Sequence, residues 1–162
     1  MILTHLLKFQ LQPNMLESLF VNSTYAKNGV YAETIKSIQG RKVCPFCPEV
    51  FPGQWHTNPI LRRSGNWLIT RNMFPYTNTQ EHLLIVGNRH IEELAQLGKG
   101  DFADILKLAK WATMKLGLPG GLLAMRFGDS AYTGATVKHI HAHLVVPKQI
   151  EGSTQVVNFP IG

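Results

Sequence analysis

The chain has 162 residues, of which 16 are Lys or Arg and 10 are Asp or Glu, so its formal net charge is +6. A charged fraction of 16% and a hydrophobic fraction of 44% exclude a disordered chain, a collagen and a highly charged coiled coil. Two cysteines are too few for a disulfide-rich secreted scaffold, and the length suits one domain. The basic balance favours an anionic partner such as a nucleotide, a phosphate or a nucleic acid.

The first 40 residues are predicted to form an extension that precedes a domain of residues 41–162. Asn14 is expected to cap a short helix over residues 15–20, and a loop rich in Asn, Ser, Thr and Gly should follow it. The apolar run at the start lacks preceding basic residues and is broken by Lys8, which is not typical of a signal peptide. No uncharged stretch approaches the roughly 18 residues of a membrane span. We therefore expect a cytoplasmic protein that does not contact a membrane.

Strands outnumber helices in the predicted domain. The elements expected, in chain order, are a hairpin of residues 60–63 and 67–70, a strand over 82–86, a helix from about 101 to 114, and strands over 122–127 and 137–146. Asp101 is expected to be the helix N-cap, and Gly117 with the Pro that follows should end the helix. This order predicts an antiparallel α+β domain with one main helix.

Three histidines alternate with apolar residues in residues 139–145, whose sequence is HIHAHLV. Because strand side chains alternate between faces, His139, His141 and His143 should share one face of a strand. Three neighbouring imidazoles are not all protonated near neutral pH, so at least one is neutral and able to act as a nucleophile, a base or a metal ligand. The triplet alone fits a metal site and a nucleophile equally well, and a histidine-decorated surface strand is a third interpretation.

The residues just before the triplet favour a phosphate-bearing ligand. A glycine-containing loop over 128–136 can present backbone N–H groups to a phosphate. Thr136 adds a hydroxyl, and Arg126 and Lys138 add positive charge. Each glycine taken singly is equally well explained by ordinary turn formation.

These features resemble the histidine triad (HIT) superfamily of nucleotide hydrolases and transferases. Residues 139–145 match its His-x-His-x-His motif fully, and residues 81–90 (EHLLIVGNRH) are similar to its Gly-His-apolar-Pro-Lys-Arg-His element, except at Glu81 and Gly87. The resemblance covers roughly residues 67–147. It implies an α+β domain with a HIT-like antiparallel sheet, one main helix and a short helical N-terminal extension, paired into a homodimer whose sheet continues across two subunits.

The resemblance also implies a mechanism. His141 would be the nucleophile that attacks the α-phosphorus and forms a covalent nucleotidyl-histidine. His143 would orient it, His82 would lie beside the same phosphate, and Thr136 would hydrogen-bond the leaving group. The implied substrates are dinucleoside polyphosphates or nucleoside phosphoramidates, and no organic cofactor is expected.

Substrate-binding residues are predicted from the same resemblance. Residues 72–76 resemble the Asn-x-aromatic-Pro-Tyr stretch of nucleotidyl-transferring relatives, so Asn72 is expected on a ribose hydroxyl and Phe74 either against the base or in ordinary packing. Arg126 and Lys138 would assist at the phosphates. The chain has Gly134-Ala135-Thr136 where many members have Gly-Gln-Ser, and the missing Gln weakens the case for a diadenosine-polyphosphate hydrolase in which that Gln contacts the phosphate chain.

Cys44 and Cys47 form a C-x-x-C pair, which suits two thiolates on one tetrahedral zinc ion. A redox motif needs a helix after the pair, and Pro48 disfavours one, while free thiols are a third alternative. Several bacterial members of the family complete a zinc site at the positions that match His90 and His139 here. The resemblance therefore implies a structural zinc ion on two cysteines and two histidines.

Two rival functions are weighed. A non-catalytic module of the same fold would bind a nucleotide or nucleic acid, but the basic residues are scattered rather than clustered, which argues against nucleic acid. A metalloenzyme with its metal on all three triad histidines would suit an all-β sheet, and the helix predicted in mid-domain argues against that. His56, like His5, is expected to be a surface histidine without a role.

Overall fold

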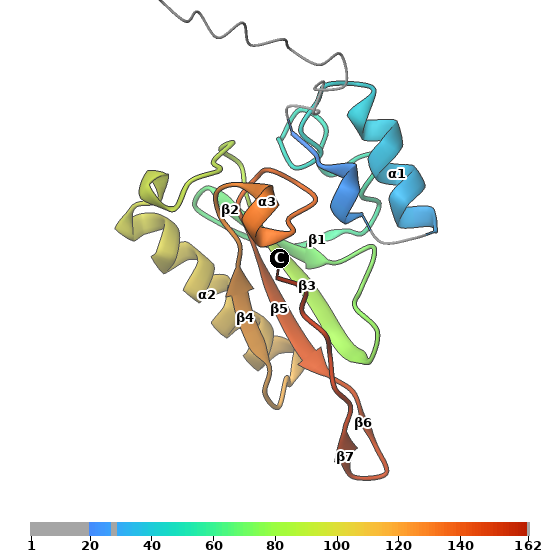
Figure 1. Cartoon of the computed structure of the whole chain (residues 1–162). Helices are drawn as coiled ribbons and strands as arrows, with labels where there is room; N and C mark the ends of the chain where they lie inside the picture. The colour runs from blue at the N-terminus through green and yellow to red at the C-terminus, as the bar shows by residue number, and fades with distance from the viewer. Residues whose placement is uncertain (1–19, 27–28, 162) are drawn as a thin grey trace, which may run out of the picture.

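The computed structural model describes residues 20–26 and 29–161, and its centre is a five-stranded antiparallel sheet (Figure 1). The strand order is β1-β2-β3-β5-β4, and a separate hairpin follows the sheet. The strands are β1 (Ile60–Ser64), β2 (Trp67–Arg71), β3 (Thr79–Gly87), β4 (Leu122–Met125), β5 (His141–Pro147), and the hairpin strands β6 (Gln149–Ile150) and β7 (Ser153–Thr154). The sheet and its main helix confirm the predicted α+β class.

Helices cover the sheet unevenly. They are α1 (Val30–Gln39), α2 (Lys99–Leu116), the four-residue α3 (Ser130–Thr133), and the short 3₁₀ turns η1 (Ser23–Tyr25) and η2 (Leu94–Gln96). The main helix α2 packs on one face of the sheet. The helix α1 lies on the opposite side of the sheet from α2 (Figure 1). None of the described helices is both long and apolar enough to cross a bilayer.

The alternation of side chains along β5 separates the core from a second face. Ile140, Ala142 and Leu144 belong to the cluster that packs against α2, with Trp67, Ile85 and Leu108 among its members. The intervening histidines therefore lie on the opposite face of the sheet, as predicted. Burial of the apolar side chains against α2, at about 25 cal/mol per Å² of apolar area, holds the histidine-bearing strand in register.

The N-terminal part of the chain contains a helix where the sequence predicted a loop. Ile35 and Ile38 of α1 are buried and pack with Val21 and Val137, and Tyr31 packs against the same cluster. Residues 31, 35 and 38 recur at helical spacing, and this short apolar stripe outweighs the polar composition around it. The helix predicted over residues 15–20 lies outside the described residues except for Phe20.

Two other predicted boundaries are wrong. The main helix begins at Lys99 with Gly98 as its N-cap, and Asp101 lies inside the first turn, where it accepts the Gly98 N–H at 2.9 Å. The strand predicted from residue 137 begins at His141, because the preceding N–H groups bond elsewhere: Lys138 donates to Phe20 at 2.8 Å. The division of the chain at residue 40 stays a prediction.

Candidate active site

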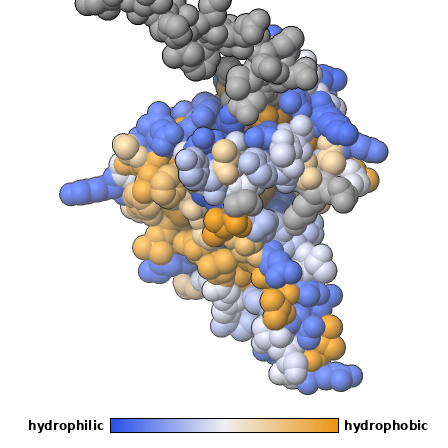
Figure 2. All heavy atoms as spheres, viewed as in Figure 1, coloured by the Kyte–Doolittle hydropathy of each residue, from blue (hydrophilic) through white to orange (hydrophobic). Residues whose placement is uncertain are grey.

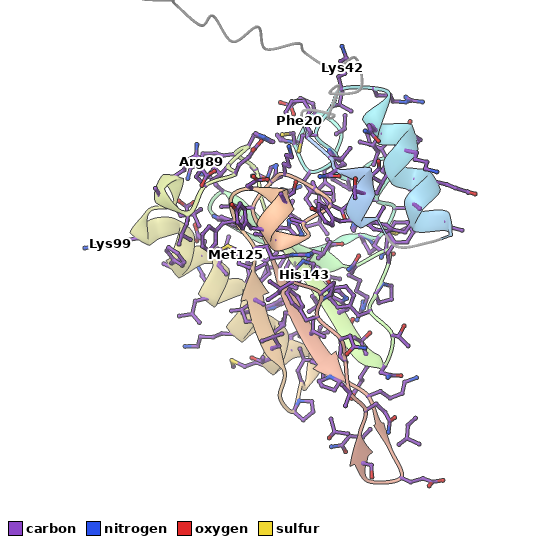
Figure 3. The ribbon with its side chains drawn as sticks, viewed as in Figure 1. Phe20, Lys42, Arg89, Lys99, Met125 and His143 are labelled. Atoms are coloured by element: carbon purple, nitrogen blue, oxygen red, sulfur yellow. The ribbon has the colours of Figure 1, made fainter. Side chains whose placement is uncertain are left out.

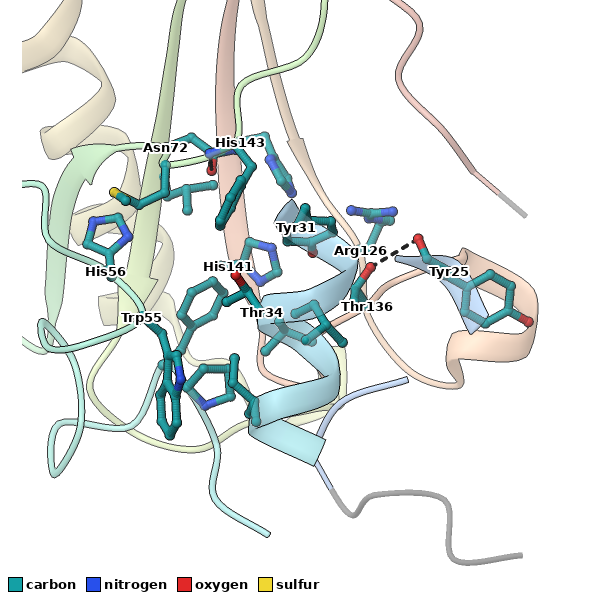
Figure 4. A pocket seen from close by; sticks show the side chains of 18 of the residues that line it. Tyr25, Tyr31, Thr34, Trp55, His56, Asn72, Arg126, Thr136, His141 and His143 are labelled. Atoms are coloured by element: carbon teal, nitrogen blue, oxygen red, sulfur yellow. Dashed lines mark hydrogen bonds between the residues drawn. The ribbon is translucent and has the colours of Figure 1, made fainter. Parts of the chain in front are cut away.

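A cavity of about 230 Å³ opens on the histidine-bearing face of the sheet (Figure 4). Its walls come from α1, from residues 45–56, from the turn at 72–76, from the loop before β5 and from β5 itself. Most of the surface that faces the cavity is apolar, although many of the residues also carry a polar group. The polar and charged lining residues include Tyr25, Tyr31, Thr34, His56, Asn72, Tyr76, Arg126, Thr136, His141 and His143.

His141 is held in one tautomer at the wall of this cavity. Its Nδ1 donates a hydrogen bond to the main-chain carbonyl of His139 at 2.7 Å, so the lone pair lies on Nε2. Burial above all, together with the nearby Arg126 charge, lowers the pKa of His141 to about 3. The ring is therefore neutral at pH 7, which is the state that a nitrogen nucleophile needs.

His143 neighbours this ring and is oriented by a chain of hydrogen bonds. The Tyr76 N–H donates to Nδ1 of His82 at 3.1 Å, which leaves the proton of His82 on Nε2. That Nε2 lies 2.9 Å from Nδ1 of His143, so it donates there and His143 carries its own proton on Nε2. The ring centroids of His141 and His143 are 4.8 Å apart, and His143 lies near the middle of the sheet (Figure 3). A lone-pair nitrogen and an N–H donor therefore stand side by side.

Asn72 and Phe74, both predicted from sequence, line the cavity together. The Asn72 carboxamide oxygen accepts the Phe74 N–H at 3.0 Å, and the Asn72 N–H donates to the carbonyl of His82 at 2.8 Å. These bonds fix the turn that connects β2 to β3. The Phe74 ring packs on Tyr31 with centroids 4.8 Å apart, so part of it serves ordinary packing.

Of the three residues predicted to assist at the phosphates, two lie at the cavity. Arg126 lines it and donates from Nη1 to the carbonyl of Gly134 at 3.2 Å. Thr136 lines it and donates to the carbonyl of Tyr25 at 3.3 Å (Figure 4). Lys138 is half-buried and is not among the residues that line the cavity. The structure thus brings Arg126 and Thr136 to His141 and leaves Lys138 outside.

Sequence reasoning missed a large part of the cavity wall. Tyr31 and Ile35 of α1 line it, although residues 1–40 were expected to be an extension. Phe46 lies between the two cysteines and packs edge-on to His141, with ring centroids 4.8 Å apart. The helical spacing of the apolar residues in α1 was a signal in the sequence, whereas no local pattern predicts the contact of Phe46.

Cys44, Cys47, His90 and His139 form the predicted cluster. One ligand atom from each residue lies within 4.8 Å of the other three. The Cys44 Sγ is 3.3 Å from Nδ1 of His139, and the Cys47 Sγ is 3.5 Å from Nδ1 of His90. Ligands of a tetrahedral zinc ion, with bonds of about 2.0–2.3 Å, lie roughly 3.4–3.8 Å from one another. The cluster therefore has the size and composition of a metal site.

The surroundings prepare both imidazoles to act as ligands. Nε2 of His139 donates to the carbonyl of Gly87 at 2.9 Å, and Nε2 of His90 donates to Glu92 at 2.9 Å. Each Nδ1 lone pair is therefore directed toward the thiols, as the second ring nitrogen of a metal-bound histidine requires. Burial raises the pKa of the Cys44 thiol to about 12, so a bound cation is needed to hold its thiolate.

A metal ion on all three triad histidines does not suit these bonds. Nδ1 of His139 faces the cysteines, Nδ1 of His141 donates to a carbonyl, and Nδ1 of His143 accepts from His82. Among the described residues, the triad histidines do not gather into a metal-ligating group of their own. The metal cluster takes the first triad histidine and leaves the other two to the cavity.

His56 was expected at the surface but is buried, with 5% of its surface exposed. Its Nε2 lies 2.9 Å from the Thr70 hydroxyl, which itself donates to the carbonyl of Pro59 and therefore accepts from His56. Burial lowers the pKa of His56 to about 4. The hydrogen bond keeps a neutral ring at the edge of the cavity.

This burial predicts a loss of stability in acid. Between pH 6.5 and 4 the unfolded His56 binds a proton that the folded ring does not, so the free energy of unfolding falls as pH falls through that window. The expected contribution between pH 7 and 4.5 is about 2–3 kcal/mol. Urea unfolding of the parent and of His56→Gln should show a shallower pH slope in the variant. Equal slopes would show that His56 titrates normally in the folded protein.

The HIT domain model matches residues 57–150. This chain belongs to the HIT family. The matched region contains β1, β2, β3, α2, β4 and β5. Both histidines of the metal cluster lie within it, and both cysteines precede it.

Comparison with solved structures finds histidine triad proteins, and the first of those that follow, with a TM-score above 0.5, agrees with the HIT fold. The histidine triad nucleotide-binding protein from Candida albicans is 24% identical, with a TM-score of 0.54 over 74% of this chain and 85% of that one. The HIT family hydrolase from Legionella pneumophila is 27% identical, with a TM-score of 0.47 over 59% of this chain and 88% of that one. The Zn-bound histidine triad family protein from Mycobacterium smegmatis is 24% identical, with a TM-score of 0.45 over 63% and 75%. No curated protein matches the sequence.

Proposed function

We propose that this HIT protein is a nucleotide hydrolase or nucleotidyltransferase that attacks an α-phosphate with His141. The proposed substrates are dinucleoside polyphosphates or nucleoside phosphoramidates. One observation carries the proposal: the His141 ring is neutral, its Nδ1–H is held by a main-chain carbonyl, and its residue lines the cavity. A nucleophile fixed in the reactive tautomer needs no proton transfer before it attacks.

The reaction proceeds in two displacements. The Nε2 lone pair attacks the α-phosphorus, a P–N bond forms, and the bond to the leaving group breaks with its electron pair on that group. The Nδ1 proton stays on the ring, so the intermediate is a nucleotidyl-imidazolium stabilised by the His139 carbonyl. Water or another acceptor then attacks phosphorus, the electron pair returns to Nε2, and the acceptor loses its proton to solvent.

Neighbouring groups stabilise the charge that develops on phosphorus. The Nε2–H of His143, set by the relay from His82, is a donor for a non-bridging phosphate oxygen. Arg126 supplies a positive charge, and the Thr136 hydroxyl can turn from the Tyr25 carbonyl toward a leaving-group oxygen. Asn72 lies at the cavity wall, where its carboxamide can meet a ribose hydroxyl.

The remaining wall suits a nucleoside. Aromatic and aliphatic side chains from α1 and from residues 45–56 face the cavity beside Phe74. Small-molecule sites are typically apolar pockets with few oriented polar groups, and a flat base gains stacking contacts with such rings. The same cavity would serve a non-catalytic nucleotide-binding module, which is the second candidate.

A substrate panel separates these candidates. Adenosine phosphoramidate, diadenosine polyphosphates and nucleoside-diphosphate sugars are incubated with the protein, and products are identified by mass spectrometry. We expect release of a nucleoside monophosphate from at least one of them, at a rate proportional to protein concentration. Binding of nucleotides with no turnover of any panel member would support the module instead.

The metal cluster is proposed to hold zinc. Two thiolates and two imidazoles in a tetrahedral-sized cluster are the donor set that zinc prefers in structural sites. With all four ligands from the protein, the ion leaves no open position for substrate. Zinc would tie residues 44–47 to the start of β5, and reduced cysteines suit the cytoplasmic location that we propose.

A homodimer is proposed through β4 and α2. The strand β4 is an edge of the described sheet, and Figure 2 shows an apolar patch over β4 and α2. Leu106 of α2 and Leu123 of β4 are exposed and line one shallow pocket between the two elements, and Phe102 and Leu122 are exposed on the same two elements. A contiguous exposed apolar patch beside an open edge favours pairing with a second copy, which would extend the sheet.

The double variant Leu122→Lys, Leu123→Lys tests this interface. Light scattering should give twice the chain mass of 18.2 kDa for the parent and the mass of a single chain for the variant. The lysines on the two paired edges would repel one another, and burying their charges in the interface is unfavourable. Val30→Lys, on an exposed residue of α1, is the matched control and should leave the dimer intact. A monomeric parent protein at micromolar concentration would contradict the proposal.

A further inference from the structure

Residues 155–161 return to the active site after the β6–β7 hairpin. Gln155 donates from its N–H to the carbonyl of Lys148 at 2.8 Å, and Asn78 donates to the carbonyl of Val156 at 2.9 Å. The segment then runs back along the sheet to the point marked C in Figure 1. Pro160, close to the end of this segment, lines the cavity. The segment lies outside residues 57–150, so the family match does not account for it.

Phe159 contacts the catalytic face directly. Its ring packs edge-on to His143, with centroids 5.4 Å apart, and edge-on to Tyr76, with centroids 5.6 Å apart. The Arg126 guanidinium carbon lies 5.4 Å from the centroid of the same ring, which is a cation–π distance. One aromatic side chain therefore touches a catalytic histidine and the cationic residue of the cavity.

Arg126 is fixed from two directions by main-chain oxygens. Its Nη1 donates to the carbonyl of Gly134 at 3.2 Å and to the carbonyl of Pro160 at 3.2 Å. Its Nε is buried and has no hydrogen-bond partner among the described residues. The two carbonyl groups therefore hold the guanidinium in place at the cavity wall.

The charge of Arg126 has no counterpart at the cavity. Among the described lining residues Arg126 is the only Lys or Arg, and none is Asp or Glu. In Figure 4, Arg126 and Thr136 lie on one side of His141, while His56 and Trp55 lie on the other. A permanent positive charge with no carboxylate beside it favours a phosphate anion on the Thr136 side.

We propose that Phe159 and Pro160 position Arg126 as a subsite for the phosphate beyond the α-phosphate, which makes the protein selective for anionic leaving groups. This rests on the proposed attack by His141 and narrows its substrate class to compounds in which the α-phosphate is bonded to another phosphate. Phe159 is a positioning residue, since it acts through Arg126.

The chemistry of the leaving group explains the selectivity. When the α-phosphorus is bonded to a phosphate, the P–O bond breaks and the oxygen departs with the electron pair as an anion that needs no proton at pH 7. A guanidinium stabilises that developing charge. An amine that leaves from a phosphoramidate must instead gain a proton, and a nearby cation opposes this protonation.

Kinetics on two substrates with the same adenylyl group test the proposal. For diadenosine tetraphosphate and adenosine phosphoramidate, kcat/KM is measured in the parent, Phe159→Ala and Arg126→Gln. We expect each variant to lose at least tenfold more with the tetraphosphate than with the phosphoramidate. The double variant should lose no more than Arg126→Gln alone, because both act through one group. Phe159→Leu should retain part of the kcat/KM for the tetraphosphate that Phe159→Ala loses. Val156→Ala changes an exposed side chain of the same segment and should leave the ratio of the two kcat/KM values unchanged.

Nucleotide binding measured by calorimetry tests the Arg126 subsite separately from the proposed attack by His141. We expect Phe159→Ala and Arg126→Gln to weaken ADP at least tenfold and AMP less than threefold, because only ADP carries the second phosphate. That result without turnover of either substrate would contradict the proposed enzyme yet support the subsite. Equal weakening of ADP and AMP, or equal loss on both substrates, would overturn the subsite and assign Arg126 to the α-phosphate.

Discussion

Replacing His141 by Asn is expected to lower kcat by about 10³-fold or more, since loss of a covalent nucleophile commonly costs at least that much. The Asn carboxamide cannot supply the imidazole lone pair that Nε2 presents, and the other histidine of the strand does not substitute for it. Nδ1 of His143 is occupied by the hydrogen bond from His82, and its Nε2 carries the proton. Steady-state turnover and nucleotide affinity are measured on the same preparation.

His56→Gln is the matched control for this variant. His56 is also a buried, neutral histidine that lines the cavity, but its Nε2 is bonded to Thr70. We expect its turnover to stay within tenfold of the parent, and nucleotide affinity to stay within about threefold in His141→Asn. A His141→Asn protein that retains full turnover would remove the nucleophile from position 141.

Removal of both thiols by Cys44→Ser, Cys47→Ser is expected to eliminate bound metal and to destabilise the fold. A ligand whose free concentration is 1,000 times its Kd adds about 4 kcal/mol to the free energy of unfolding, so the variant is expected to lose stability of that order. Turnover should fall as well, because His139 is a member of the metal cluster and its carbonyl holds Nδ1 of His141. Plasma mass spectrometry for metal content and urea unfolding are the measurements.

A chelator supplies the internal control for the metal. The parent should contain close to one zinc ion per chain and should lose stability when the ion is extracted, while the double variant should be insensitive to the chelator. A purified parent without metal, whose stability does not respond to added zinc, would show that the four residues form a hydrogen-bonded cluster only.

The sequence predicted the histidine-bearing strand well because its pattern is local. The alternation of histidines with Ile140, Ala142 and Leu144 determines both faces of β5 once the apolar face packs on α2. The metal cluster was also predicted, although its cysteines and histidines lie 43 to 95 positions apart in the sequence. That prediction came from the family resemblance, since spacing within the C-x-x-C pair alone left three alternatives.

The parts that sequence did not predict depend on long-range packing. No local pattern indicates that Phe159 meets His143, because the contact exists only after the β6–β7 hairpin reverses the chain. Burial of His56 likewise depends on distant residues. Its ring is bonded to Thr70 of β2 and packs on the Phe51 ring, with the centroids of His56 and Phe51 4.5 Å apart. The start of the main helix was misplaced because Asp101 is as favourable within the first turn, near the helix N-terminus, as it is at the N-cap.

The most direct measurement is mass spectrometry of the protein quenched during turnover of diadenosine tetraphosphate at neutral pH. A P–N bond to imidazole survives in base better than in acid, so digestion is done under alkaline conditions. We predict one adenylyl group on the peptide that contains residues 139–145, assigned by fragmentation to His141 and missing in His141→Asn. An adduct on a different residue, or turnover with no adduct at any quench time, would contradict nucleotidyl transfer through His141.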